Sequence, residues 1–188
     1  MSTAVSAQTS PLAEQLDACS AEAAALASLS EAQGRWRPGP DRWSVAECLA
    51  HLAAFAREYQ PGLDAAVRAA GARGPAQRPF RPGWVGRWLV AQMEPTEKRG
   101  MRAPAAFAPP ADVTLADASR AFAEAQAAVR ATVRAADGLD LRSATVRSPV
   151  LPVLRFSLGT ALAVLAAHER RHLAQARRVT REAGFPVA

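Results

Sequence analysis

Four stretches of this 188-residue chain repeat apolar residues every three or four positions, and prolines separate several of them. This spacing places the apolar side chains on one stripe of an α-helix. No segment alternates between apolar and polar residues strongly enough to support a sheet. Amphipathic helices must bury their stripes against one another, so the sequence predicts an all-α protein, a four-helix bundle. We expect a single domain over residues 1–188, because a chain of this length holds one domain comfortably and two poorly.

Start and stop signals bound the four helices. Pro11 follows Ser10 and suits the first helical position. Ser44 and Glu47 have the spacing of a capping box, in which each side chain bonds the other residue's backbone amide. Glycines follow each apolar stripe and supply the stops. The predicted helices span residues 10–34, 44–71, 114–138 and 157–183.

Prolines interrupt the helical pattern between residues 71 and 111. They exclude a long helix there and predict a long proline-rich crossover between helices two and three. A short helix is expected around Val85 to Met93. Trp84, Trp88 and Phe107 predict that at least part of this connection packs against the bundle.

Charge and composition limit the partners that we expect. The net charge is +6, but the arginines are scattered along the chain, which favours solvated surface residues and no specific nucleic-acid partner. No run approaches 18 apolar residues, and the first residues lack a basic region followed by an apolar core. We therefore expect no membrane partner, no secretion signal and a cytoplasmic location. Cys19 and Cys48 form neither a Cys-x-x-Cys pair nor a disulfide framework, which fits a reducing compartment.

The apolar stripe of the last helix is interrupted by three polar residues that follow one another along the stripe, His168, His172 and Gln175. Burying an unpaired polar group costs about 1–3 kcal/mol, so these side chains need partners. Histidines four residues apart lie side by side on a helix and commonly present two nitrogen ligands to one ion. His51 is the third histidine of the chain, and it also faces the predicted core. A single inward histidine is usually a hydrogen-bonded core residue, but all three together predict a divalent metal site formed by His51, His168 and His172.

Three neighbouring side chains have alternative interpretations. Glu47 can orient His51 or act as a fourth ligand, although the capping box already explains it. Cys48 can be a soft ligand or a reactive thiol, and burial as a packing residue is favoured. Gln175 can bond a metal-bound water or a substrate, or make a packing contact between helices.

Residues 168–172 also match the His-Glu-x-x-His pattern of zinc peptidases, whose glutamate is a general base. Those enzymes take a third ligand from well downstream, and only sixteen residues follow His172. We therefore expect no peptidase. Glu169 is interpreted as a surface residue of the helix or as a partner at a helix contact.

Two segments resemble the signature segments of the DinB-like superfamily, WSVAECLAHL at residues 43–52 and HERRHLAQ at residues 168–175. The resemblance extends from the first predicted helix to the last. It implies a four-helix bundle with a long crossover and a three-histidine metal site. The first metal histidine of the family falls on His51, and the closing pair falls on His168 and His172. The family includes bacterial low-molecular-weight-thiol transferases, a thiol-dependent isomerase and many members without a known activity.

A site with three protein ligands leaves a coordination position for water or substrate, which is the catalytic pattern. Zinc is the first choice, and nickel, iron, manganese and cobalt also suit three imidazoles. We expect a metal-dependent enzyme of the thiol-dependent S-transferase or hydrolase type that activates a small thiol or water. Its partners would be a small-molecule thiol or an electrophile, with Arg78, Arg81 and Arg87 holding an anionic thiol. The alternative is a non-catalytic metal-binding stress or interaction protein, and a homodimer is compatible with either.

Overall fold

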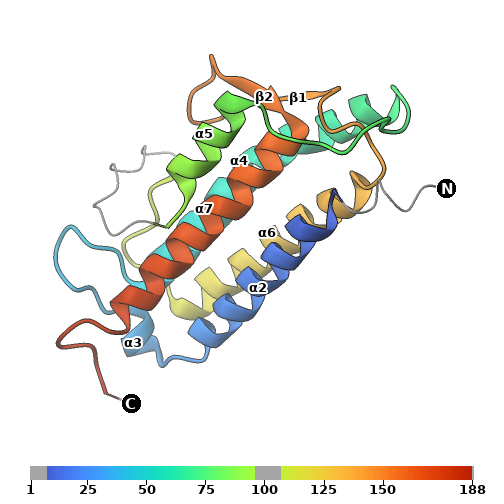
Figure 1. Cartoon of the computed structure of the whole chain (residues 1–188). Helices are drawn as coiled ribbons and strands as arrows, with labels where there is room; N and C mark the ends of the chain where they lie inside the picture. Colours follow the sequence, from blue (N-terminus) through green and yellow to red (C-terminus); the bar gives the residue numbers. More distant parts are fainter. Residues whose placement is uncertain (1–7, 96–106, 188) are drawn as a thin grey trace.

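The computed structural model describes residues 8–95 and 107–187. Expectations for residues 1–7 and for the 96–106 part of the middle connection lie outside the described residues. Among the described residues the chain is mostly helical, so the predicted all-α class is confirmed. The four long helices are α2 (Ser10–Ala27), α4 (Val45–Gly71), α6 (Leu115–Ala135) and α7 (Leu158–Val179) (Figure 1).

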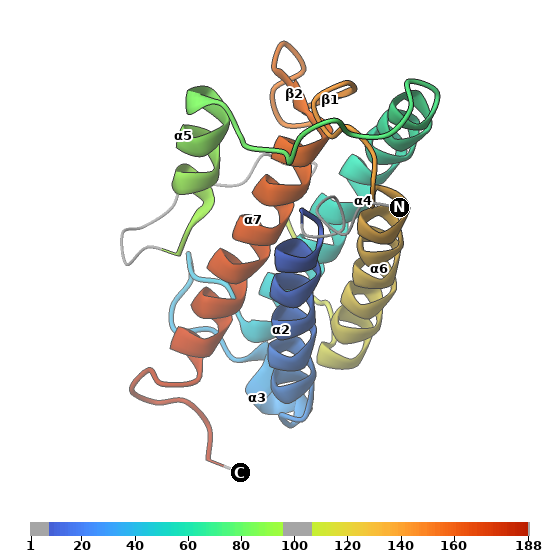
Figure 2. The same cartoon turned by 45° about the vertical axis from the view of Figure 1, so that its right-hand side comes forward.

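These helices form a closed bundle. α4 packs against α6 and α7, and α2 packs against the same two helices. α4 and α6 run in the same direction, whereas α2 and α7 run in the opposite one (Figures 1 and 2). The chain must therefore return from one end of the bundle to the other between α4 and α6, and this return is the predicted crossover.

The core consists mainly of leucine, valine and alanine side chains on the facing helix stripes. Burying a leucine contributes about 1.5–3 kcal/mol relative to leaving it exposed, so these stripes account for most of the stability of the bundle. The largest fully buried leucines are Leu16, Leu49, Leu52, Leu63, Leu141, Leu158, Leu162, Leu165 and Leu173. Within the described residues, no helix combines the length and the apolar character needed to cross a membrane.

The start of α4 is the predicted capping box. The Glu47 amide donates to Ser44 Oγ over 3.2 Å, and the Ser44 amide donates to the Glu47 carboxylate over 2.9 Å. α4 ends at Gly71 as predicted, although Pro61 lies inside it and removes one helical hydrogen bond. This capped end fixes the first two turns of α4, which carry His51.

The first predicted helix is too long. α2 ends at Ala27, where the Ser28 hydroxyl donates to the Ala25 carbonyl and so competes with the helical bond. A separate short helix, α3 (Glu31–Arg35), then begins with Ser30 as its cap. Gly34 lies inside α3 and is not a helix stop.

The last predicted helix is also too long. α7 ends at Val179, four residues before the predicted end, because the Thr180 hydroxyl donates to the Arg177 carbonyl in its last turn. Gly184 follows beyond the helix with a left-handed φ of +85°.

A small sheet was not predicted. β1 (Thr145–Arg147) and β2 (Arg155–Ser157) pair antiparallel, with Thr145 opposite Ser157. Each strand has three residues, which is too short for an alternating pattern to be recognised in the sequence. The hairpin leads directly into α7.

The predicted short helix is confirmed as α5 (Trp84–Met93), which packs on the outside of α7. Phe107 is 3% exposed and packs down as predicted. The two indoles of α5 do not pack down with it: Trp84 and Trp88 are 77% and 58% exposed. The reason is the face that α5 turns to α7: a Cβ built on Gly86 would lie 2.9 Å from Thr160 Oγ1, so this closely packed face has no room for an indole.

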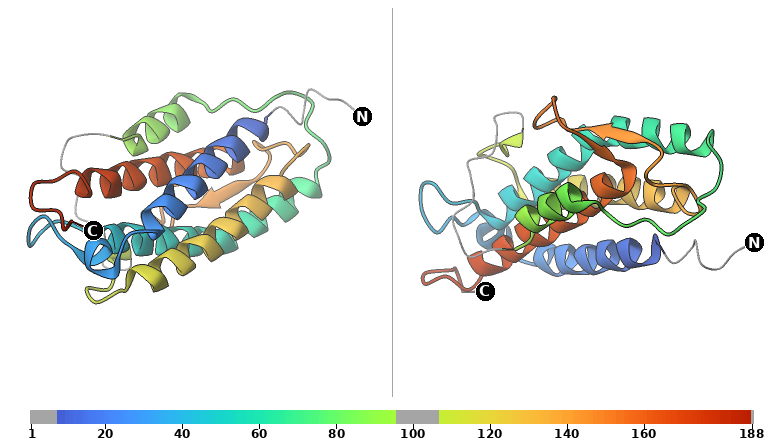
Figure 3. Two further views of the ribbon diagram at one scale, coloured as in Figure 1. Left: turned by 90° about the horizontal axis from the view of Figure 1, so that it is seen from below. Right: turned by 45° about the horizontal axis from the view of Figure 1, so that its top comes forward.

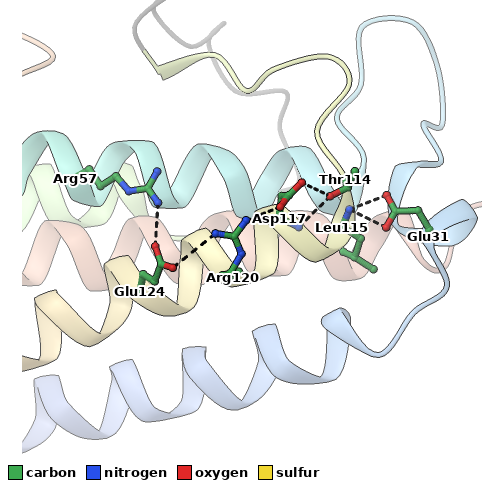
Figure 4. A network of polar contacts seen from close by, with 7 residues as sticks. All are labelled: Glu31, Arg57, Thr114, Leu115, Asp117, Arg120 and Glu124. Carbon is green, nitrogen blue, oxygen red and sulfur yellow. Dashed lines mark hydrogen bonds and ion pairs between the residues drawn. The ribbon is translucent and has the colours of Figure 1, made fainter.

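Polar contacts tie α6 to α3 through Glu31 and to α4 through Arg57, which pairs with Glu124 (Figure 4). The Glu31 carboxylate accepts the Leu115 amide over 2.9 and 3.1 Å and satisfies one of the free N–H groups of α6. Along α6, Arg120 contacts Asp117 and Glu124. These charged pairs are exposed, so solvent screens them and they contribute little to stability. Figure 3 shows the short α3 beside that end of α6.

Candidate metal centre

The three histidines meet between α4 and α7. His51 lies in the second turn of α4, and His168 and His172 lie one turn apart on α7. His51 and His168 are 4% and 6% exposed, and His172 is half-buried. One ligand atom from each residue can be chosen so that all three lie within 4.8 Å of one another, so the cluster could hold a metal ion.

Hydrogen bonds determine which nitrogen of two rings carries the proton. His51 Nδ1 lies 2.6 Å from the Phe107 carbonyl, which can only accept, so Nδ1 carries the hydrogen. His172 Nδ1 lies 3.0 Å from Gln175 Oε1, and the same reasoning applies. In a neutral imidazole the other nitrogen is then a bare acceptor. The Nε2 atoms of His51 and His172 can therefore bind a metal. In known metal sites, a hydrogen bond from the other ring nitrogen orients the histidine in the same way.

The third ring is held by packing. The His168 ring stacks on Phe55 with centroids 3.8 Å apart, and its Nε2 lies 3.3 Å from Nε2 of His51. Its Nδ1 is buried without a hydrogen-bond partner among the described residues. Phe55 therefore fixes the plane of the ring. Without a metal, the bare Nε2 of His51 favours the tautomer in which His168 Nε2 donates to it.

Burial keeps all three rings neutral. It lowers the pKa of His51, lowers the pKa of His172 to about 3 and lowers the pKa of His168 well below its usual value. The nearby histidines lower the pKa values of His168 and His172 further, because a second positive charge in the cluster would be repelled. Neutral imidazole is the form that binds a metal.

The donor set fits a divalent metal. Ring nitrogens of the three histidines converge in a largely buried place, and the hydrogen-bond partners recorded for them among the described residues are the Phe107 carbonyl, Gln175 and each other. Such a cluster is unfavourable without a positive charge or a proton to share. Imidazole nitrogen suits zinc, copper, iron and nickel, so the residues favour this class of ion over calcium or magnesium.

Trp43 covers one side of the cluster. Its ring lies 4.7 Å from the His51 centroid and 5.6 Å from the His172 centroid. It directly precedes the capping box of α4, and no sequence pattern other than the family segment marked it as part of the site. With Phe55 it limits the access of water to the rings.

Glu47 and Cys48 do not join the cluster. The buried Glu47 carboxylate bonds the Ser44 amide and takes two hydrogen bonds from Arg37, at 2.8 and 2.6 Å. Cys48 is fully buried, and burial raises the pKa of its thiol strongly, so it is a poor nucleophile. These contacts favour a helix-capping role for Glu47 and a packing role for Cys48.

The structure gives Gln175 and Glu169 hydrogen-bond partners within the protein. Gln175 accepts a hydrogen bond from His172 on its own helix, so it orients a ring of the cluster. Glu169 is 3% exposed and accepts a hydrogen bond from Gln126 of α6 over 2.9 Å. Its interpretation as a surface residue is wrong, and its interpretation as a partner at a helix contact is confirmed.

Sequence reasoning missed the Phe107 carbonyl. It lies 56 residues from His51 and is a backbone atom, so no side-chain pattern marks it. The sequence predicted only that Phe107 packs against the bundle. That expected burial was the one sign that its backbone could lie near the histidines.

The arginines proposed to hold an anionic thiol lie away from the cluster. Gly86, next to Arg87, packs on Thr160 near the start of α7. Thr160 precedes His168 by eight residues, which is about 12 Å along a helix. The C-terminal end of α5 lies closer to the histidines, because Arg171 donates to the carbonyls of Gln92 and Glu94.

Comparison with known proteins identifies the family of the chain. A family model of the DinB superfamily matches residues 15–176. The chain belongs to the DinB superfamily. All three histidines of this DinB-superfamily protein fall within the matched segment. Searches of curated proteins and of solved structures gave no match.

Proposed function

We propose that this DinB-superfamily protein binds one divalent metal ion through His51, His168 and His172, with zinc as the first choice. We further propose that it is a metal-dependent enzyme of the S-transferase or hydrolase type, acting with a small thiol or with water. The observation that carries the proposal is the convergence of three neutral, buried imidazoles, two of which have their Nε2 lone pairs fixed by hydrogen bonds at Nδ1.

Each surrounding residue has a part in this proposal. The Phe107 carbonyl and Gln175 hold two rings in the tautomer that a metal requires. Trp43 and Phe55 pack on the rings and restrict water. When bound, a divalent ion lowers the pKa of a coordinated thiol or water and so supplies a nucleophile near neutral pH. His172 is the most exposed of the three rings, so a small substrate would approach over it.

One observation favours the non-catalytic alternative. His51 and His168 are almost completely buried, and Trp43 lies over His51. A metal-binding interaction protein needs no open approach to the ion, whereas an enzyme does. The two candidates therefore differ in whether an added thiol reaches the metal.

The first experiment measures the metal. Purified protein is analysed for bound metals, then stripped with a chelator and titrated with zinc, nickel, cobalt, manganese and iron. We expect one ion per chain in the wild type and a large loss of affinity in His51→Ala, His168→Ala and His172→Ala. Gln92→Ala, in an exposed residue of α5, is the matched control and should bind normally. Full occupancy in the three histidine variants would contradict the proposed site.

The second experiment separates the two candidates. Cobalt-substituted protein is mixed with small thiols, and its absorption spectrum is recorded before electrophiles are added. A thiol-dependent change in the spectrum together with turnover that His172→Ala loses supports the enzyme. An unchanged spectrum and no turnover with any thiol or hydrolysable ester would support the non-catalytic protein.

A further inference from the structure

The loop that joins β1 and β2 is apolar and exposed. Residues 149–154 read Pro-Val-Leu-Pro-Val-Leu. Leu151 is 54% exposed, Val153 is 88% exposed and Leu154 is 37% exposed. Several consecutive exposed apolar residues are unfavourable in water and usually mark a surface that meets another molecule. Arg147 Nε donates to the Pro152 carbonyl over 2.6 Å, so the loop is held in this shape.

A second exposed apolar face lies on α5. Trp84 and Trp88 stand one helical turn apart, and Val85 beside them is 48% exposed. The opposite face of α5 packs on α7, so the two indoles point away from the bundle. The start of α5 and the β1–β2 hairpin lie at the same end of the bundle (Figures 1 and 2). We define the end patch as Trp84, Val85, Trp88, Leu151, Val153 and Leu154.

The charge around the end patch is mainly positive among the described residues, although Asp137 and Asp140, between α6 and β1, also lie at this end. Residues 65–93 and 141–168 supply most of this end of the molecule and contain no aspartate or glutamate. Because the whole chain has a net charge of +6, all other residues together have a net charge of −2. The arginines are scattered along the sequence, but the fold gathers eight of them at one end. They are Arg68, Arg73, Arg78, Arg81, Arg87, Arg142, Arg147 and Arg155.

We propose that the end patch docks on the surface of an anionic lipid bilayer. Leu151, Val153 and the two tryptophans would enter the headgroup region, and the arginines around them would contact lipid phosphates. Tryptophan with arginine is the composition of surfaces that lie at a membrane interface. The earlier expectation of no membrane partner rested on the missing span, and surface docking needs no span.

Charge and side-chain type favour a bilayer over two other occupants. A second copy of the chain would bring eight more arginines against the first eight, which repel one another. Single-stranded nucleic acid binds by stacking its bases on aromatic rings. Leucine and valine at the hairpin tip offer no ring for stacking, whereas the acyl boundary of a bilayer accepts them.

The test uses the full-length protein and vesicles of two compositions, phosphatidylcholine alone and phosphatidylcholine with phosphatidylglycerol. We expect co-sedimentation with the anionic vesicles and a shift of tryptophan emission to shorter wavelength. Binding should weaken as salt is raised, because salt screens the arginines. Vesicles without phosphatidylglycerol should bind little protein.

Variants separate the apolar and the charged contributions. The double variant Leu151→Ser/Val153→Ser should lower the partition coefficient about tenfold or more. Its control is Val187→Ser, since Val187 is 95% exposed outside the patch. Arg78→Gln/Arg155→Gln should lower binding to anionic vesicles about fivefold per arginine. Arg35→Gln/Arg181→Gln, at the opposite end of the bundle, removes the same charge and is its control. All of these positions are exposed, and far-UV circular dichroism checks the fold.

Three outcomes overturn the proposal. The first is no co-sedimentation with anionic vesicles at low salt. The second is binding that falls equally in the patch variants and in their controls, which would show a general effect of charge. The third is a patch-dependent complex with DNA or with a second copy of the chain, seen by sedimentation velocity, in place of vesicle binding.

Discussion

The Nε2 atoms of His51 and His168 lie 3.3 Å apart, although the two residues are 117 positions apart in the chain. His51 Nε2 has no hydrogen, because Nδ1 of the same ring donates to the Phe107 carbonyl. The stability of this arrangement therefore depends on what occupies the space between the rings and on the protonation of the rings. The predictions below test both, together with the packing that supports them.

Without metal, the protein should lose stability as the pH falls below 6.5. The pKa of His168 lies well below its usual value and the pKa of His172 is lowered to about 3, so below pH 6.5 the unfolded chain takes up protons that the folded chain does not. Each of these residues should lower the free energy of unfolding by on the order of 1 kcal/mol per pH unit over the range in which it stays neutral in the folded state. The pKa of Glu169 is raised to about 7, so its contribution has the opposite sign and offsets about half of this loss between pH 6 and 5. Urea unfolding with a chelator at pH 7.5, 6.5 and 5.5 measures the effect, and a free energy independent of pH would contradict it.

Replacement of Gln175 should weaken metal binding without abolishing it. Gln175 Oε1 accepts a hydrogen bond from His172 Nδ1, and removal of such an outer contact typically costs 10- to 100-fold (about 1.4–2.7 kcal/mol) in metal affinity. We expect this loss for Gln175→Leu in a competition titration with a zinc chelator dye. Gln92→Leu, in an exposed residue of α5, should have the wild-type affinity. Equal affinities for wild type and Gln175→Leu would mean that Gln175 has only a packing role.

Glu169→Gln should stabilise the protein at alkaline pH. Burial raises the pKa of the Glu169 carboxyl to about 7, so above that pH the folded state must hold a buried charge that the unfolded chain exposes to water. An amide removes this cost and keeps an acceptor for Gln126. The gain should be on the order of 1–3 kcal/mol at pH 8 and should disappear toward pH 5. Chemical unfolding at both pH values tests this, with the exposed Glu124→Gln as the control. If Glu169→Gln is less stable than the wild type at pH 8, the prediction is wrong.

Two glycine-to-alanine substitutions should differ in their effect on stability. A Cβ on Gly34 would lie 2.6–2.9 Å from the side chain of Leu115, at the contact of α3 with α6, and should destabilise the protein by about 1–3 kcal/mol. A Cβ on Gly71, the last residue of α4, would meet nothing within 4 Å. Gly71→Ala should be neutral or stabilising by up to about 1 kcal/mol. Thermal melts of both variants make the comparison, and equal melting temperatures would show that α3 adjusts without strain.

The sequence predicted several local features of this protein correctly. The capping box of Ser44 and Glu47, the end of α4 at Gly71 and the α5 helix depend on residues within a few positions of one another. The same is true of His168 and His172, whose four-residue spacing brings them together on any helix. The inward direction of His51 also follows from the period of its own helix. The candidate cluster could therefore be predicted because each histidine lies on the buried stripe of a regular helix.

Only the tertiary structure decided which groups surround these residues. The Phe107 carbonyl reaches His51 across 56 positions, and Glu169 meets Gln126 because α6 and α7 place them in contact. The direction of Trp84 and Trp88 depends on which face of α5 fits against Thr160, and a helix that is apolar on both faces gives no local sign of it. The sequence determines which face of a helix avoids water. What that face meets depends on close packing between segments that are distant in the chain.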